Sequence, residues 1–141
     1  MAVTDKKGVC LSFKMSSALL TKIHRTEIIL HMEFQQCMGF LLEFILSVAE
    51  LEKRFRLLPL QFDCAPVKES RKLRLSEQLA EALEKYAHES NLGSGQQACQ
   101  LLDLACDLVR ISFDQHGAVL RKGEFIRWAL EHLAARWVKV H

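Results

Sequence analysis

The chain has 141 residues, of which half are apolar and 26% are charged, a composition typical of a globular protein and not of a disordered one. At this length it forms one domain, or two very small ones, and it can bury a core without disulfides or metals. Two prolines and six glycines are too few for the frequent turns of a β-sandwich or barrel, and a net charge of +2 indicates no partner by itself.

The cysteines and the apolar segments indicate a compartment. Five cysteines without a Cys-x-x-Cys pair predict neither a disulfide framework nor a zinc site, and they favour a reducing, cytoplasmic environment. The first twenty residues lack the pattern of a signal peptide. The longest apolar run, residues 40–48, is about half the length that spans a bilayer and contains Glu43, so we expect a buried helix there and no membrane span.

The first half of the chain predicts one strand followed by helix. In residues 9–15 apolar residues alternate with polar or small ones, the pattern of a half-buried strand. Ser16 or Ser17 can then accept a first-turn amide as a helix N-cap. Helix is favoured throughout residues 19–55. Almost every face of residues 34–46 is apolar, which predicts a place in the core or in an oligomer interface.

The second half predicts the same order of elements. Residues 57–70 form a linker bracketed by two prolines, and a short strand with one basic face follows at residues 72–75. Ser76 is the expected cap of the next helix. The glycine-containing cluster 91–95 ends that helix and begins a second one, expected from Gln96 to Val109.

The last thirty residues predict a hairpin and one more helix. Residues 110–113 and 118–121 flank Asp114-Gln115-His116-Gly117, which has the composition of a four-residue turn. Residues 123–138 then show the apolar periodicity of an amphipathic helix.

A shift of sixty residues aligns the two halves without a gap. Residues 13–16 fall on residues 73–76, and apolar helix positions fall on apolar helix positions, with five identities between residues 13–50 and 73–110. Amphipathic helices match one another easily, so the similarity of the two halves fits either a duplication or the shared periodicity of unrelated helices. The shared strand and capping serine favour duplication, since they do not arise from helical periodicity.

This order of elements resembles the ribbon-helix-helix (MetJ/Arc/CopG-like) DNA-binding superfamily. The resemblance is carried by a strand of alternating basic and apolar residues, a capping serine, a helix, a glycine-containing junction and a longer helix, clearest in residues 72–110. Two copies in one chain resemble the tandem TraY-type plasmid transfer proteins. Residues 32–35 hold no junction glycine, which predicts one continuous helix in the first copy. The region after Ser112 has no place in the family fold.

The resemblance implies a fold class and a division of the chain. We expect a mainly helical α+β protein with short strands, in which two strand-helix-helix units form an intramolecular pseudo-dimer. The first, degenerate unit covers residues 8–56, the linker residues 57–70, the second unit residues 71–111, and a C-terminal hairpin with an amphipathic helix residues 112–141.

The resemblance also implies DNA-binding residues. In that family two strands pair as an antiparallel ribbon that enters the major groove, where lysine and arginine suit guanine acceptors. The outward side chains would be Lys72 and Arg74 from one strand and Ser12 and Lys14 from the other. For Lys72 and Arg74 the alternative is a solvated charge run beside the linker.

A second set of contacts would position the DNA backbone. The first amides of the helix that begins near Ser94 and Gly95 have no partner within the helix, so they can hold a phosphate with the help of the helix dipole. An ordinary helix–helix turn is the alternative for this cluster.

Two functions follow. The first is a sequence-specific double-stranded DNA-binding protein, either a repressor or a plasmid or phage accessory factor, with no enzymatic activity and no cofactor. The second is a helical assembly subunit of a larger complex, which self-associates or docks on a protein partner through the Phe34–Phe55 helix. No catalytic constellation has suitable spacing. His24, His31 and Cys37 share one helical stripe, but they lack a fourth ligand, so we expect no metal site.

Overall fold

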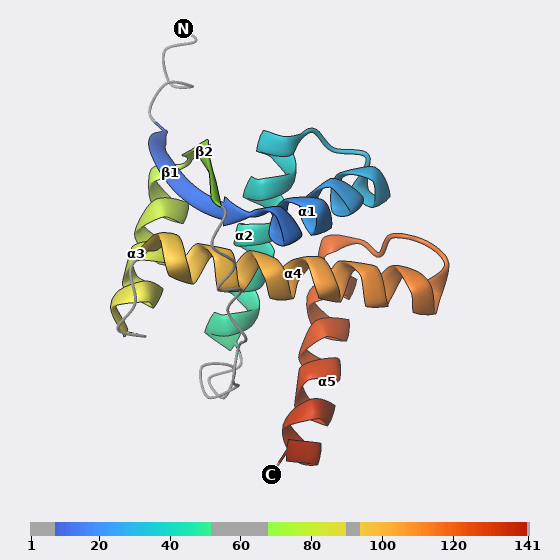
Figure 1. Ribbon diagram of the computed structural model, residues 1–141. Coiled ribbons are helices and arrows are strands. Elements are labelled where there is room, and N and C mark those ends of the chain that lie inside the picture. The colour runs from blue at the N-terminus through green and yellow to red at the C-terminus, as the bar shows by residue number, and fades with distance from the viewer. Residues whose placement is uncertain (1–7, 52–67, 90–93, 141) are drawn as a thin grey trace, which may run out of the picture.

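The computed structural model describes residues 8–51, 68–89 and 94–140, which form five helices and a two-stranded antiparallel sheet (Figure 1). The mainly helical α+β class expected from the sequence is therefore confirmed. In chain order the elements are β1 (Val9–Ser16), α1 (Ser17–Leu30), α2 (Phe34–Leu51), β2 (Lys68–Leu75), α3 (Glu77–Glu89), α4 (Ser94–His116) and α5 (Lys122–Val140).

Both predicted strands exist and pair with each other. The register sets Val9 opposite Leu75 and Ser16 opposite Lys68, so the two eight-residue strands match along their whole length. β2 starts within the stretch that was expected to be linker, and the prediction that residues 68–70 are linker is wrong. These residues lack apolar alternation, and they are held in the strand by pairing with residues 14–16 of β1. Residues 52–67, which hold the rest of the expected linker, lie outside the described residues.

Serines begin the helices that follow the strands. The Ser16 hydroxyl accepts the Leu19 amide at 3.2 Å, and the Ser76 hydroxyl accepts the Leu79 amide at 3.1 Å. Each serine therefore satisfies one of the amides that a helix N-terminus leaves without a partner. The structure selects Ser16, not Ser17, as the first cap.

The continuous helix expected across residues 32–35 is not formed. α1 ends at Leu30, and His31 adopts the left-handed conformation with φ 55° and ψ 46°. The Met32 amide donates to the Glu27 carbonyl at 3.1 Å, which closes the helix end as glycine-containing caps usually do. α2 then leaves at an angle of 94° to α1.

The expected C-terminal hairpin is also wrong. α4 continues through residues 110–113 to His116, because Val109 and Ser112 are buried and extend the packed stripe of the helix. Gly117, with φ 69°, provides the turn, and its amide donates to the Phe113 carbonyl at 2.8 Å. The final helix, expected at residues 123–138, is confirmed as α5.

The core lies where α2 and α4 cross beneath the inner face of the sheet (Figure 1). The packing joins the two halves of the chain: α4 contacts β1 and α1, whereas α2 contacts β2 and α3. α5 packs on α2 and α4, and Phe125 stacks on Phe44 with ring centroids 4.0 Å apart. Within the described ranges no single helix is long and apolar enough to cross a membrane, and only α1 and α2 taken together as a bent pair pass that test.

Candidate nucleic-acid interface

The sheet has one buried face and one exposed face. Phe13, Met15, Leu73 and Leu75 are almost fully buried against the helices. Because side chains alternate along a strand, the residues between them point outward. Six of these outward side chains are exposed: Cys10, Ser12 and Lys14 from β1, and Ser70, Lys72 and Arg74 from β2. The structure therefore brings Ser12, Lys14, Lys72 and Arg74 together on one surface, as the sequence predicts, and it adds Cys10 and Ser70, which sequence reasoning did not select.

This outward face is basic. Among the side chains that the structure describes, the outward positions of the two strands carry three cations and no acidic group. Glu69 alternates with the outward residues of β2 and so belongs to the other face of the strand, where it forms an ion pair with Arg71 at 2.9 Å. The Arg71 guanidinium also lies 5.9 Å from the centre of the Phe34 ring, so this arginine is held at the rim of the ribbon. The cations left at the centre of the face are Lys14, Lys72 and Arg74.

The first turns of α2 and α4 lie against the two edges of the ribbon. The Gln35 side-chain amide donates to the Arg74 carbonyl at 2.7 Å, which fixes the start of α2 beside β2. On the other edge the Cys99 thiol donates to the Lys14 carbonyl at 3.3 Å, one turn after α4 begins. Both helices therefore point their N-termini, with their partial positive charge, toward the ribbon side of the molecule.

Ser94 and Gly95 begin α4, two residues earlier than expected. Their backbone amides belong to the first turn, where amides lack intrahelical partners. The equivalent start of α2 at Phe34 was missed by sequence reasoning, because no glycine marks that junction. The signal that would have found it is the sixty-residue shift, which places Phe34 on Ser94.

A close approach fixes the position of Arg74. A Cβ atom added to Gly8 would lie 2.7 Å from Arg74 Cγ and 2.9 Å from the Leu75 carbonyl oxygen. Only glycine leaves room for this contact between the entry of β1 and the end of β2. The stem of Arg74 therefore lies along the backbone of residue 8.

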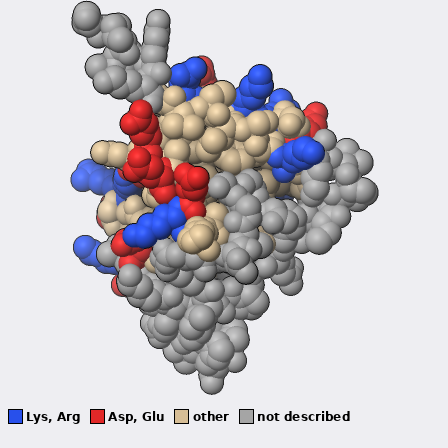
Figure 2. All heavy atoms as spheres, turned by 90° about the vertical axis from the view of Figure 1, so that its left-hand side faces the viewer, with Lys and Arg blue, Asp and Glu red and all other residues tan. Residues whose placement is uncertain are grey.

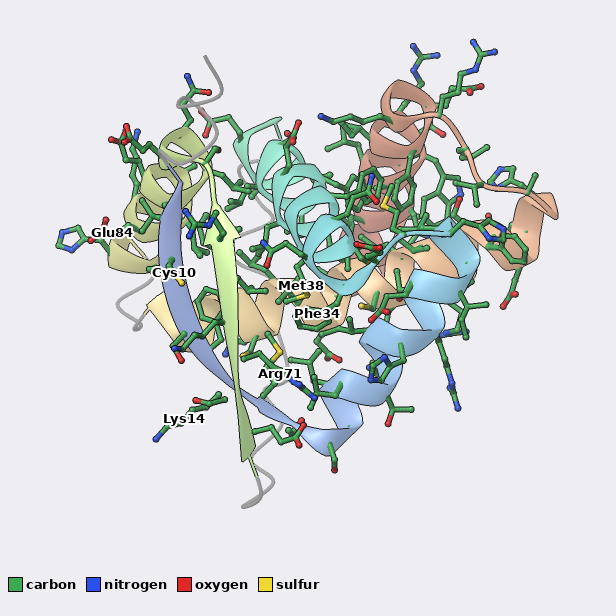
Figure 3. The ribbon with its side chains drawn as sticks, turned by 90° about the horizontal axis from the view of Figure 1, so that it is seen from above. Cys10, Lys14, Phe34, Met38, Arg71 and Glu84 are labelled. Atoms are coloured by element: carbon green, nitrogen blue, oxygen red, sulfur yellow. The ribbon has the colours of Figure 1, made fainter. Side chains whose placement is uncertain are left out.

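Acidic side chains flank one side of the ribbon. Glu77, Glu81 and Glu84 are exposed on α3, and Figure 2 shows acidic side chains gathered on the face that forms the left-hand side of Figure 1. In Figure 3, Glu84 lies on the same side of the molecule as Cys10 and Lys14. The basic ribbon thus has an acidic helix beside it.

The remaining candidate groups are structural. Burial raises the pKa of the Cys37 and Cys106 thiols to about 12, with a smaller contribution to Cys37 from the nearby Cys106, so both remain protonated at neutral pH. In the described part of the chain, no group of three or more His, Cys, Asp or Glu side chains is placed to hold a metal ion. His24 Nδ1 lies 3.2 Å from Glu27 Oε2 on the same helix, and Cys37 does not complete a set of three metal ligands with these two residues.

Comparison of the chain with protein-family models, with curated protein sequences and with solved structures gives no match.

Proposed function

We propose that the protein is a sequence-specific double-stranded DNA-binding protein of the ribbon-helix-helix type, which inserts the outward face of β1 and β2 into the major groove. The observation that carries the proposal is a two-stranded antiparallel ribbon with apolar side chains on one face and, among the described side chains, three cations on the other. A two-stranded ribbon fits the width of the major groove, where each base pair presents a distinct pattern of donors and acceptors.

The order and spacing of the elements support this fold assignment. β1, α1 and α2 are followed by β2, α3 and α4, and each of the four helices starts sixty residues from its counterpart. The register pairs Ser12 with Lys72, residues that are themselves sixty apart, so the two-fold axis of the ribbon and the sequence repeat coincide. The buried positions also correspond: Phe13, Met15, Ile23, Leu41, Leu42 and Val48 in one half, and Leu73, Leu75, Leu83, Leu101, Leu102 and Leu108 in the other.

The helix N-termini give the face a means of holding DNA in register. Phosphate contacts position a protein on the duplex, whereas base contacts specify the sequence. With the ribbon in the groove, the first turns of α2 and α4 flank it on both edges, and their free amides suit the phosphates of the two strands. Lys14, Lys72 and Arg74 are the side chains that reach the bases. The role would be that of a repressor or of a plasmid or phage accessory factor in the cytoplasm.

The alternative, a helical assembly subunit, depends on the apolar Phe34–Phe55 helix. In the described part of that helix, residues 34–51, the large apolar side chains pack in the core of the chain itself, with Phe44, Leu41 and Leu42 fully buried. Residues 52–55 lie outside the described residues. The strands at residues 9–16 and 68–75 favour DNA binding over this alternative.

Duplex binding by the wild-type protein and two double variants tests the proposal. Fluorescence anisotropy with labelled duplex DNA at two salt concentrations would compare wild type, Lys72→Ala/Arg74→Ala, and the charge-matched control Arg121→Ala/Arg127→Ala. All four residues are exposed, and the control pair lies at α5, away from the ribbon. We expect the ribbon variant to lose about 1–3 kcal/mol for each base contact removed, and the control to bind as wild type does apart from a small general charge effect.

The salt dependence gives a second readout. Log affinity should fall linearly with log salt, with a slope of about −0.9 for each phosphate contacted. No duplex binding at low salt, or equal losses in the ribbon variant and the control, would contradict the proposal. In the latter case binding would reflect net charge alone.

A further inference from the structure

The two central positions of the ribbon present different groups. Ser12 and Lys72 face each other in the register and are both exposed, and they stand across the two-fold axis that relates the halves of the ribbon. One offers a short hydroxyl, whose oxygen lies 3.5 Å from the Ser70 hydroxyl, and the other a long cation. The neighbouring outward positions are matched in kind: Lys14 corresponds to Arg74, and Cys10 to Ser70. Among the described outward side chains, the centre is therefore where the face departs from two-fold symmetry in charge.

The flanking helices differ in the same direction. α3 carries exposed Glu77, Glu81 and Glu84, whereas the positions sixty residues earlier on α1 are all uncharged or weakly basic: Ser17, Thr21 and His24. In Figure 3, Glu84 lies on the same side of the molecule as Cys10 of β1. Backbone phosphates that approach these positions of α3 meet carboxylates, and those that approach the corresponding positions of α1 do not. The two halves of a bound duplex would therefore have different surroundings at the bases and along the backbone.

We infer that the DNA this protein recognises is an asymmetric duplex: a nearly palindromic site in which guanine stands beside the axis on the Lys72 side and is not required on the Ser12 side. This inference rests on the proposed function. Lysine suits the O6 and N7 acceptors of guanine, whereas serine accepts a contact with any base. A perfect palindrome presents the same base to both positions, so one of its two central guanines finds no cation.

Ser12→Lys and Lys72→Ser make the ribbon symmetric in opposite ways. Both side chains are exposed and lie on the outward face of the ribbon, away from the core, so thermal melting and circular dichroism should show the wild-type fold for each variant. A preferred site would first be selected from a pool of random-sequence duplexes with the wild-type protein. Two duplexes would then be compared for each protein, the selected site and a copy in which only the two-fold mate of the guanine beside the axis is also made guanine.

We expect wild type to bind the two duplexes with equal affinity within about twofold. Ser12→Lys should bind the copy with two guanines roughly tenfold more tightly than the selected site, because a second lysine–guanine contact forms. Lys72→Ser should lose roughly tenfold on both duplexes. A palindromic wild-type consensus, or a Ser12→Lys protein that does not distinguish the two duplexes, would overturn the inference while leaving DNA binding intact. Absence of any selected duplex at low salt would overturn the proposed function itself.

Discussion

Replacement of Phe125 by alanine tests how α5 is held on the rest of the chain. Phe125 is 4% exposed, stacks on the fully buried Phe44 at 4.0 Å with ring planes 8° apart, and stacks on Trp128 at 6.1 Å. Truncation of a buried phenylalanine costs about 3–5 kcal/mol, and the ring pair adds a coupling of about 0.5–1.5 kcal/mol. Phe125 lies in the first turn of α5, where the helix can settle partly into the gap, so we expect the lower end, about 3 kcal/mol. For a chain of this length that corresponds to a fall in Tm of about 10 °C.

Urea unfolding measures this loss, with Ile28→Ala as the matched control. Ile28 is 73% exposed, and its truncation should change the free energy of unfolding by less than about 0.5 kcal/mol. The double variant Phe44→Ala/Phe125→Ala should lose less than the sum of the two single losses, by the coupling given above. A cost below about 1 kcal/mol for Phe125→Ala would refute the packing of α5 on α2. DNA affinity measured below the melting range should be unchanged, because the ribbon does not rest on α5.

Two further results follow from the helix caps and the thiols. Ser16 is 3% exposed and Ser76 is exposed, so Ser16→Ala leaves the Leu19 amide without a partner and out of reach of water. Thermal or urea unfolding should show that Ser16→Ala lowers the free energy of unfolding by about 2 kcal/mol and Ser76→Ala by about 0.5–1 kcal/mol. Equal losses would contradict this reasoning. Alkylation at pH 8 followed by mass spectrometry should modify the exposed Cys10 rapidly and the buried Cys37 and Cys106 only on unfolding. Because burial raises the pKa of these two thiols from 9.0 to about 12, the unfolded chain loses their protons first, and the free energy of unfolding should fall as pH rises from about 9 toward 12. Stability that is flat across that range would contradict their burial.

The buried position of Phe44 also limits what one substitution can reveal about the assembly alternative. A carboxylate at a fully buried site has no partner there, and its burial is costly enough to unfold the domain. Phe44→Asp would therefore abolish any partner binding and any DNA binding together. Substitutions on the ribbon face separate the two functions, because the side chains there are exposed.

The parts of the fold that local chemistry determines could be predicted from the sequence. The alternation of apolar residues at 9–15 predicts β1 to within a few residues, and the serine that follows each strand predicts the cap of the next helix. The structure has both the strands and the caps. The start of β2 at Lys68 could not be predicted, since Lys68, Glu69 and Ser70 are polar and become strand only by pairing with β1. The left-handed conformation of His31 could not be predicted either, because a histidine by itself does not indicate it. The Met32–Glu27 hydrogen bond and the turn into α2 stabilise this conformation.

The hairpin expected after Val109 failed for a related reason. Residues 114–117 have turn composition, but only Gly117 takes a turn conformation, because buried Ser112 and the stripe before it keep α4 helical to His116. Of the candidate site, the alternation predicted which side chains point outward. It could not predict the contacts of Gln35 and Cys99 with the ribbon edges, which depend on how α2 and α4 cross.

The ribbon depends on both halves of the chain for its existence. It takes one strand from each half, and a two-stranded sheet alone is at best marginally stable in water. Its inner face is buried by helices that also come from both halves, with α4 on β1 and α2 on β2. The outward face is therefore presented only when the whole interleaved core is folded, so any variant that opens the contact between α2 and α4 should abolish the proposed DNA binding and the core together. Variants at Ser12, Lys14, Lys72 or Arg74 should instead change DNA binding while the fold remains.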